Sequence, residues 1–349
     1  NKLLLYSCKR SARHEWSDTA ETKLARFTSG EYMETTLTAD NEETVAPTGA
    51  KPHRHAVLIV NAKSRQGKAG FETAKQTLSE MGVTLRQAYD LTDPSRLSQT
   101  VETSLREGAD LLVIGGGDGS FRTVANRIAN TDATLGILPL GTVNDFARNL
   151  GIEPTIPEAC RVIAEGYTTQ VDLCRANDKH FLITASIGYS ADAQAFLTSD
   201  LKRRFGPFGY LIAGIKAIRA IKPFAVTVKH AGGTETLQSV QAGVIGGHYW
   251  MGGAVEIPGI SIEGGKLAFY SVAPQSGWEM LRLYRALKRR QFYRTPGLRA
   301  FRCEEVTLET PLPLKAVLDG DIDCETPLSL SVAANALRVC VPKPEQMLS

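Results

Sequence analysis

A glycine-rich segment with one carboxylate is the first candidate for chemistry. The apolar run Leu111–Ile114 leads directly into Gly115–Ser120, and a helix is expected to follow. Glycines allow a sharp turn and expose backbone N–H groups, and a helix N-terminus adds partial positive charge, so this place suits a phosphate. A carboxylate repels phosphates unless a cation lies between, so Asp118 favours a magnesium–phosphate site. The alternative is a tight turn in which Asp118 only caps the helix.

Two common nucleotide motifs are absent from these glycine segments. A dinucleotide-binding G-x-G-x-x-G pattern fails, because its sixth position holds Ser120 or Arg122, depending on the starting glycine. The segment Gln66–Ala69 resembles the end of a P-loop, but Ala62 stands at the leading glycine position. Ala69 stands where a Ser or Thr would meet Mg²⁺.

Two further polar segments are expected to lie beside the glycine-rich one. Pro139–Arg148 follows the next expected strand and includes Asn144 and Asp145, and Asn61–Arg65 follows the first expected strand. The carboxyl ends of parallel strands meet at one edge of a sheet, where ligands usually bind. We therefore expect the three segments to converge near Asp118.

The elements that must position these segments alternate between strand and helix. Alternation implies parallel strands joined by crossover helices. We assign residues 56–165 to an α/β nucleotide-binding domain and residues 1–55 to a poorly ordered arm. Strands are predicted at 56–60, 83–89, 111–114 and 135–138, and helices at 71–81, 93–108 and from about 120.

After Gly166 the expected strands become short and frequent. They are predicted at 171–175, 181–187, 225–230, 240–245, 267–272, 305–309, 315–318, 328–332 and 337–341, with helices at 191–221 and 278–290. This pattern favours a β-sandwich domain over residues 166–342, whose last strands could return to the first domain, and a tail over 343–349. The predicted fold is an N-terminal α/β domain with a parallel sheet plus a C-terminal β-sandwich.

Composition excludes several classes of protein. The 40 Lys and Arg against 37 Asp and Glu give a net charge of +3, which is too small to favour nucleic acid as a partner. No apolar run approaches the ~20 residues of a membrane-spanning helix, and we expect no export signal. The 6 cysteines form no C-x-x-C pair, and His53 and His55 are expected to be solvated. A cytoplasmic protein with reduced thiols and no zinc site follows.

Two motifs together resemble the diacylglycerol kinase catalytic domain, in its bacterial lipid kinase branch. They are Gly116–Ser120 and Pro139–Arg148, and the resemblance extends from about Ala56 to Pro342. NAD kinases and phosphofructokinases share the Gly-Gly-Asp-Gly motif, whereas Gly-Thr-x-Asn-Asp-Phe-Ala-Arg is far more specific to lipid kinases. The resemblance implies an ATP-binding domain and a β-sandwich domain that closes a cleft for the lipid.

The resemblance also implies roles for single residues. Asp321, in Asp319-Gly320-Asp321, stands where the family has the Glu proposed as general base. Asp118, Asp145 and Asp172 would form a water-linked acidic network, and Asp118 would bind Mg²⁺ together with the ATP phosphates. The residues expected to contact ATP are Asn61, Ala62, Lys63, Ser64, Arg65, Thr92, Gly116, Gly117, Asp118, Gly119, Ser120, Gly141, Thr142 and Asn144.

Several positions depart from the family pattern. The pair Arg122–Thr123 stands where Asn-Glu is common, Asp321 is one methylene shorter than the usual Glu, and Gly246 replaces an Asn. Gly264 stands where relatives carry the first Asp of an Asp-Gly-x-Leu-Asp pattern, which binds an accessory magnesium. We expect that site to be absent, although Glu263 could substitute from one residue away.

The function predicted from these residues is ATP- and Mg²⁺-dependent phosphorylation of a lipid hydroxyl, on diacylglycerol or a related lipid. The alternatives are an NAD-kinase-like enzyme with a soluble substrate and a nucleotide-binding regulatory protein with a decayed site. The clusters Lys202–Phe208 and Lys288–Arg290 predict peripheral contact with an anionic membrane, or else are solvated helix faces. We expect a cytoplasmic protein, with a candidate location at the inner membrane face. The lipid and the oligomeric state stay open, with a homodimer as the candidate.

Overall fold

The computed structural model describes residues 55–64, 66–189, 223–273, 285–286, 292–295 and 297–343. All of them lie in the second of two units into which the chain divides, Glu43–Ser349. The expected arm and tail therefore lie almost wholly outside the described residues. So do the expected helix at 191–221, most of the expected helix at 278–290, and the basic clusters Lys202–Phe208 and Lys288–Arg290.

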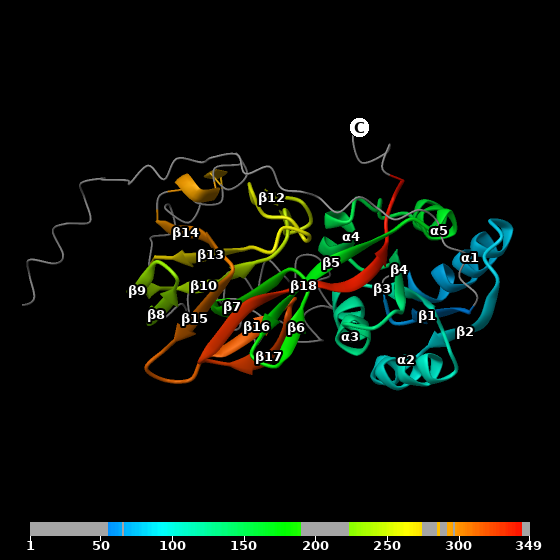
Figure 1. Cartoon of the computed structure of the whole chain (residues 1–349), viewed down its shortest axis with the longest axis horizontal. Helices are drawn as coiled ribbons and strands as arrows, with labels where there is room; N and C mark the ends of the chain where they lie inside the picture. The colour runs from blue at the N-terminus through cyan, green and yellow to red at the C-terminus, as the bar shows by residue number, and fades with distance from the viewer. Residues whose placement is uncertain are drawn as a thin grey trace, which may run out of the picture. The chain divides into compact units, whose positions relative to one another are not determined.

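Four parallel strands form the first part of the fold. Their order is β2-β1-β3-β4 (Figure 1), and β1 and β3 consist of buried apolar and glycine residues, except for the partly exposed Asn61 that ends β1. Strands that are buried on both faces have nearly continuous apolar sequences. The bounds are β1 Ala56–Asn61, β2 Leu85–Leu91, β3 Leu111–Gly116 and β4 Thr134–Pro139.

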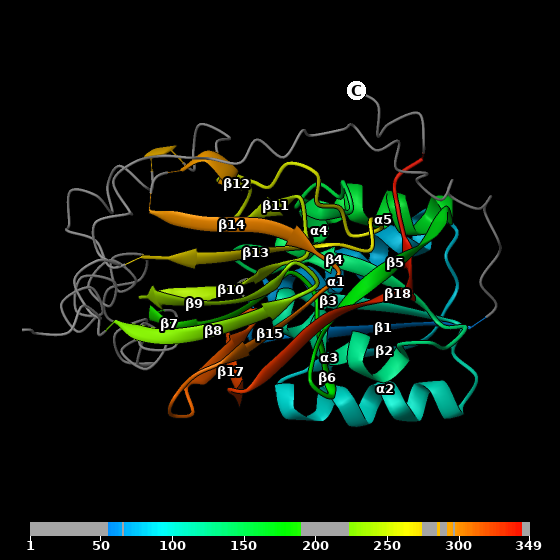
Figure 2. The same ribbon diagram turned by 60° about the vertical axis from the view of Figure 1, so that its left-hand side comes forward.

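Helices cover both faces of this parallel sheet. The pair α1 and α5 packs on one face and the pair α2 and α3 on the other (Figure 2), as crossover connections require. Each presents an apolar stripe inward, such as Phe121, Val124 and Ile128 of α3. The bounds are α1 Gly67–Glu80, a 3₁₀ turn η2 Pro94–Arg96, α2 Leu97–Arg106, α3 Asp118–Ile128, α4 Asp145–Asn149 and α5 Ile156–Glu165.

The second part of the fold is a sandwich of two sheets. One sheet has the order β14-β13-β10-β7-β16-β17, and the other continues the first sheet through β18-β15-β8-β9. Apolar side chains of both sheets, among them Phe181, Phe269 and Leu330, form a core of their own. The parallel sheet followed by this sandwich confirms the predicted fold class. The strands are β5 Thr168–Ala176, β6 Lys179–Phe181, β7 Thr184–Gly188, β8 Phe224–His230, β9 Gly233–Ser239, β10 Gln241–Ile245, β11 Tyr249–Trp250, β12 Val255–Glu256, β13 Leu267–Val272, β14 Leu298–Cys303, β15 Glu305–Glu309, β16 Lys315–Leu318 and β17 Asp321–Glu325, with a 3₁₀ turn η3 Phe292–Arg294.

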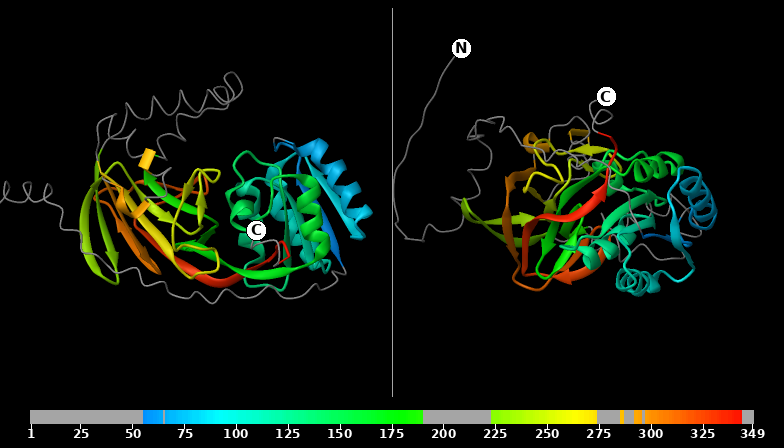
Figure 3. Two further views of the ribbon diagram at one scale, coloured as in Figure 1. Left: turned by 90° about the horizontal axis from the view of Figure 1, so that it is seen from above. Right: turned by 45° about the vertical axis from the view of Figure 1, so that its right-hand side comes forward.

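The last strand corrects one sequence prediction. The two strands expected at 328–332 and 337–341 are a single strand, β18 (Leu328–Cys340). Its register on β5 shifts between Ala333 and Leu337, where Asn335 has a φ of +52° and donates its N–H to Asp172 Oδ1 at 2.9 Å. The irregular stretch Ala333–Ala336 holds alanines and Asn335 but no large apolar residue, so the sequence pattern predicts a break there. β18 pairs antiparallel with β5 along both parts of the fold and parallel with β4 (Figure 3).

Two further observations bear on the earlier expectations. No helix within the described ranges is long and apolar enough to cross a membrane. The cysteines at 160, 174, 303, 324 and 340 are free thiols.

Candidate functional site

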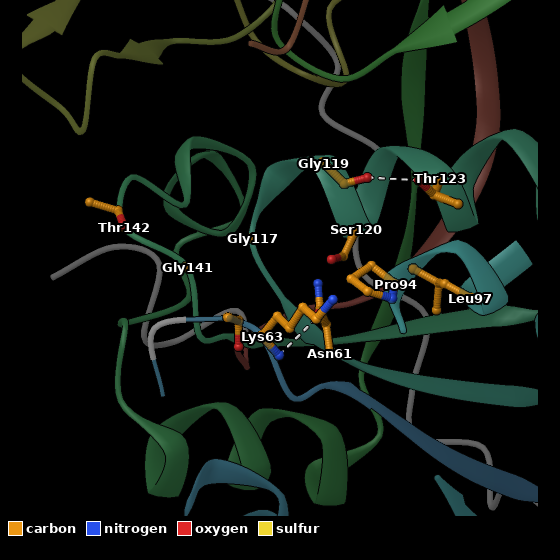
Figure 4. Close-up of a pocket in the computed structure, with 11 residues that line it drawn as sticks. Asn61, Lys63, Pro94, Leu97, Gly117, Gly119, Ser120, Thr123, Gly141 and Thr142 are labelled. Carbon is orange, nitrogen blue, oxygen red and sulfur yellow. Dashed lines mark hydrogen bonds between the residues drawn. The ribbon is translucent and has the colours of Figure 1, made fainter. Parts of the chain in front are cut away.

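Loops that follow three parallel strands line one pocket of about 410 Å³ (Figure 4). They are the segments after β1, β3 and β4, which the sequence analysis expected to meet at the carboxyl edge of the sheet. The predicted residues that line the pocket are Asn61, Lys63, Ser64, Gly117, Gly119, Ser120, Gly141 and Thr142. Pro94, Leu97 and Thr123 complete it.

Close backbone contacts explain several glycines around the pocket. A Cβ on Gly141 would lie 2.6 Å from Gly117 Cα, and a Cβ on Gly116 would lie 2.5 Å from Ser120 Oγ. A Cβ on Gly67, at the start of α1, would lie 2.4 Å from the carbonyl oxygen of Ala62. A larger residue at 141 or 67 would push neighbouring backbone segments apart, and one at 116 would displace Ser120. Glycine here therefore brings the loops together and leaves the backbone accessible to a ligand.

Polar side chains converge in the same space. Figure 4 shows Asn61, Lys63 and Ser120 pointing into the gap between the loops. Ser64 Oγ is buried and has no hydrogen-bond partner among the residues that the structure describes. A buried hydroxyl without a partner is costly, so a ligand oxygen beside it would be stabilising. Together with the cationic Lys63 and the N-terminus of α3, this lining fits a phosphate chain.

Asp118 joins the β3 loop to the β4 loop. Its carboxylate accepts hydrogen bonds from the N–H groups of Asp145 (3.1 Å) and Phe146 (3.0 Å), at the start of α4. Burial raises the pKa of Asp118, although these backbone N–H groups act in the opposite direction. Asn144 precedes α4 in the left-handed conformation, and its Oδ1 accepts the Gly141 N–H at 3.1 Å. Asn144 therefore shapes the loop but does not line the pocket.

Asp145 links this loop to the sandwich domain. Its Oδ1 accepts the N–H of Gly252 at 2.8 Å, and Asn149, one turn later, exchanges hydrogen bonds of 2.9 Å with the backbone of Tyr249. Burial raises the pKa of Asp145 to about 6, and the nearby charge of Asp118 acts in the same direction. The two carboxylates therefore form a pair with perturbed pKa values beside the pocket, a frequent sign of a functional site.

A third carboxylate lies close to the pocket residue Gly119 and belongs to the hairpin of β16 and β17. Asp319 fixes this hairpin, because its side chain accepts the N–H groups of residues 182, 183 and 184 at 2.6, 2.9 and 3.0 Å. Burial raises the pKa of Asp319 to about 6. Asp321 follows at the first position of β17, and a Cβ on Gly119 would lie 3.4 Å from its Oδ2. Its carboxylate thus lies over a residue that lines the pocket.

Asp172 has different neighbours from Asp118 and Asp145. Its carboxylate accepts the N–H groups of Gly265 (2.7 Å) and Asn335 (2.9 Å). Nearby, Glu263 Oε1 accepts a hydrogen bond from Thr169 Oγ1 at 3.0 Å, and burial raises the pKa of Glu263. Within the described ranges no group of three or more His, Cys, Asp or Glu side chains could hold a metal ion. The expected absence of an accessory magnesium site at Gly264 stays a prediction.

The remaining predicted contacts have other positions. Ala62, Thr92, Gly116 and Asp118 belong to the segments around the pocket but do not line it, and Arg65 lies outside the described residues. Pro94 and Leu97 were missed, although they follow the end of β2 and reach the same edge. Thr123 was missed too, although it lies one helical turn after Gly119 and donates to its carbonyl oxygen at 2.9 Å.

Comparison with known proteins assigns both parts of the chain to families. Residues 55–176 match the family "Diacylglycerol kinase catalytic domain", and residues 184–341 match "YegS C-terminal NAD kinase beta sandwich-like domain". Residues 55–176 are thus a diacylglycerol kinase catalytic domain, which confirms the resemblance seen in the motifs.

Individual relatives share between 23% and 33% of their residues with this chain. An uncharacterized protein of Synechocystis (sll0036) is 28% identical over 274 residues, 76% of this chain and 62% of that protein. A diacylglycerol kinase of Staphylococcus aureus is 33% identical over 167 residues, 47% of this chain and 49% of that enzyme. The chain therefore spans only about half to three fifths of these relatives. The crystal structure of a diacylglycerol kinase from Bacillus anthracis superposes with a TM-score of 0.68 at 23% identity, covering 84% of this chain and 99% of that one.

Proposed function

We propose that this protein is an ATP-dependent lipid kinase, which transfers the γ-phosphate of ATP to a hydroxyl of diacylglycerol or a related lipid. The observation that carries the proposal is the meeting of a glycine-lined pocket and an acidic side chain from the other domain. Gly119 lines the pocket, and a Cβ on Gly119 would lie only 3.4 Å from Asp321 Oδ2. Phosphoryl transfer depends mainly on such positioning and on charge neutralisation.

The residues in and around the pocket have different roles in the proposed reaction. Lys63 and the N-terminus of α3 attract the phosphates, and Ser64 and Ser120 offer hydroxyl groups to phosphate oxygens. The hydrogen bonds of Asp118 hold the β3 and β4 loops in one arrangement. Asp321 accepts the proton of the lipid hydroxyl as it attacks, a contribution of about 10²–10⁴-fold for general bases of this kind.

Mg²⁺ fits this site as a phosphate-bound ion. Few protein carboxylates are needed for such an ion, because phosphates and waters complete its shell. Asp118 would hold it together with the ATP phosphates, and there it would neutralise the charge that builds up during transfer.

The test is phosphate transfer from labelled ATP by the purified full chain, with diacylglycerol, phosphatidylglycerol, a sphingoid base and NAD as separate acceptors. We expect one lipid to be phosphorylated, and we expect Asp118→Asn and Asp321→Asn to lose at least 100-fold in kcat. Full activity in either variant would remove that residue from the mechanism. Phosphorylation of NAD alone would favour an enzyme of the NAD kinase type, to which the description of the second matched family refers.

The place of action proposed is the cytoplasmic surface of a membrane. The lipid substrate requires access to a bilayer, and the two basic–aromatic clusters of the sequence suit anionic headgroups. Binding to anionic vesicles should weaken when Lys202–Arg204 and Lys288–Arg290 are neutralised. Undiminished binding would contradict this part of the proposal.

A further inference from the structure

Arg122 and Asp321, two residues that depart from the family pattern, contact each other. Arg122 lies on α3 and Asp321 begins β17, and Arg122 Nη2 lies 3.2 Å from Asp321 Oδ2. The same guanidinium reaches Asp323, with 2.6 Å between Nη1 and Oδ2. Both carboxylates therefore reach one guanidinium, whose planar fork holds them together.

Asp323 is the better-anchored of the two carboxylates. The Arg122 side chain is only 12% exposed and that of Asp323 31%, whereas that of Asp321 is 64% exposed. Lys179 Nζ lies 2.7 Å from Oδ1 and 2.7 Å from the carbonyl oxygen of Asp323. Burial opposes the charge of Asp323, but the hydrogen bond from Lys179 and the charge of Arg122 hold the pKa of its carboxyl below the usual value. Partly buried ion pairs of this kind are stronger than exposed ones.

Asp321 keeps one oxygen available. Its Oδ2 accepts the bond from Arg122, whereas its Oδ1 has no hydrogen-bond partner among the described residues. The contact with Arg122 also brings the carboxylate over Gly119, at the edge of the pocket. Oδ1 is therefore free to accept the proton of an acceptor hydroxyl while Oδ2 is held.

We propose that Arg122 is a positioning residue, which compensates for the Asp321 side chain being one methylene shorter than that of a glutamate. Its fork on Asp321 and Asp323 fastens the β16–β17 hairpin to α3, so that an aspartate can serve where relatives use a glutamate. The inference rests on the proposed function, because it requires Asp321 to accept the acceptor's proton. A displacement of about 1 Å can cost roughly 100-fold in rate, so the position of this carboxylate matters.

The main experiment is a double-mutant cycle on the kinase activity of the full chain. We expect Arg122→Asn and Asp321→Glu each to lower kcat by about 10- to 100-fold while the KM for ATP changes less than about threefold. The double variant should lose much less than the product of the two losses, with a coupling of at least tenfold. Arg122→Lys should fall between wild type and Arg122→Asn, because an ammonium group cannot bridge two carboxylates as a guanidinium does.

Arg127→Asn is the matched control. Arg127 is also on α3 and pairs with Glu102 at 3.2 Å, but both side chains are about half exposed and neither belongs to the pocket. Its kcat should equal that of wild type. Losses that simply multiply in the cycle, or equal kcat values for Arg122→Asn and Arg127→Asn, would overturn the positioning role and leave the kinase assignment intact.

Hydrogen–deuterium exchange gives a readout that does not need activity. The backbone of residues 321–325 should exchange faster in Arg122→Asn and at the wild-type rate in Arg127→Asn. Unchanged exchange in Arg122→Asn would contradict the proposal that Arg122 fastens the β16–β17 hairpin to α3, whatever the activity shows. A wild-type chain that phosphorylates none of the lipids would instead overturn the proposed function, and the positioning role with it.

Discussion

Replacing Gly246 by alanine tests why this chain lacks the asparagine of the family pattern. A Cβ on residue 246 would lie 2.1 Å from Cys174 Sγ, whereas non-bonded heavy atoms rest about 3.5–4.0 Å apart. Neither group can withdraw easily. Cys174 is 3% exposed in the sandwich core, and the Gly246 N–H is bonded to the carbonyl oxygen of Ile183 at 2.8 Å. Close packing against Cys174 therefore explains the glycine at position 246.

The expected cost follows from the size of this overlap. Over-packing a core costs about 1–3 kcal/mol, and an overlap of more than an ångström favours the upper end. We expect Gly246→Ala to be destabilised by about 3 kcal/mol and to melt roughly 5 °C lower or more. Cys174→Ala alone should cost about 1 kcal/mol, and it should leave room for the new methyl group.

The assay is thermal and urea unfolding of the two single variants and the double variant. The double variant should be about as stable as Cys174→Ala alone, which is a strongly non-additive result. A Gly246→Ala protein as stable as wild type would refute the packing explanation. So would a double variant whose loss equals the sum of the single losses.

Three further predictions concern the site. Asp145→Asn keeps an acceptor for the Gly252 N–H but removes a carboxylate whose pKa is raised to about 6 by burial. Because the folded state penalises the charged form, the stability of the wild type should fall as pH rises from about 4 to 6 and then level off. The variant should not show this fall, and at pH 8 urea unfolding should find it more stable than wild type by up to roughly 3 kcal/mol. Gly141→Ala should push away Gly117, whose Cα would lie 2.6 Å from the new Cβ, and weaken ATP binding at least tenfold by calorimetry; unchanged affinity would place the nucleotide elsewhere. Asp319→Ala should leave the N–H groups of residues 182–184 without their acceptor and cost about 2–4 kcal/mol in unfolding experiments, whereas a loss below 1 kcal/mol would contradict a structural role for this carboxylate.

The sequence was sufficient to predict the loops that meet in the pocket. The alternation of apolar runs with helices specifies parallel strands, and parallel strands bring their following loops to one edge. The residue order alone therefore predicts that Asn61, Gly119 and Thr142 lie together, because it shows both the local pattern and the topology.

Other features depend on contacts that the residue order does not contain. The strand β9, Gly233–Ser239, was not predicted because an edge strand with little buried surface carries few apolar residues. The bond of Asp172 to Asn335 depends on the register shift between β5 and β18, and its bond to Gly265 depends on the loop before β13. No spacing in the sequence encodes either contact. The contact between Arg122 and Asp321 joins residues 199 positions apart, so each could be noticed as unusual but not as a partner of the other.

The strand β18 has a consequence for how the protein is made. It supplies the neighbour of β4, yet β4 ends at Pro139 and its partner residues Arg338 and Val339 are synthesised about 200 residues later. At about 5–20 residues per second, the nascent chain would carry an uncovered strand edge for roughly ten seconds or more. A truncated chain that stops before Leu328 never covers that edge, so such fragments should aggregate unless a chaperone holds them.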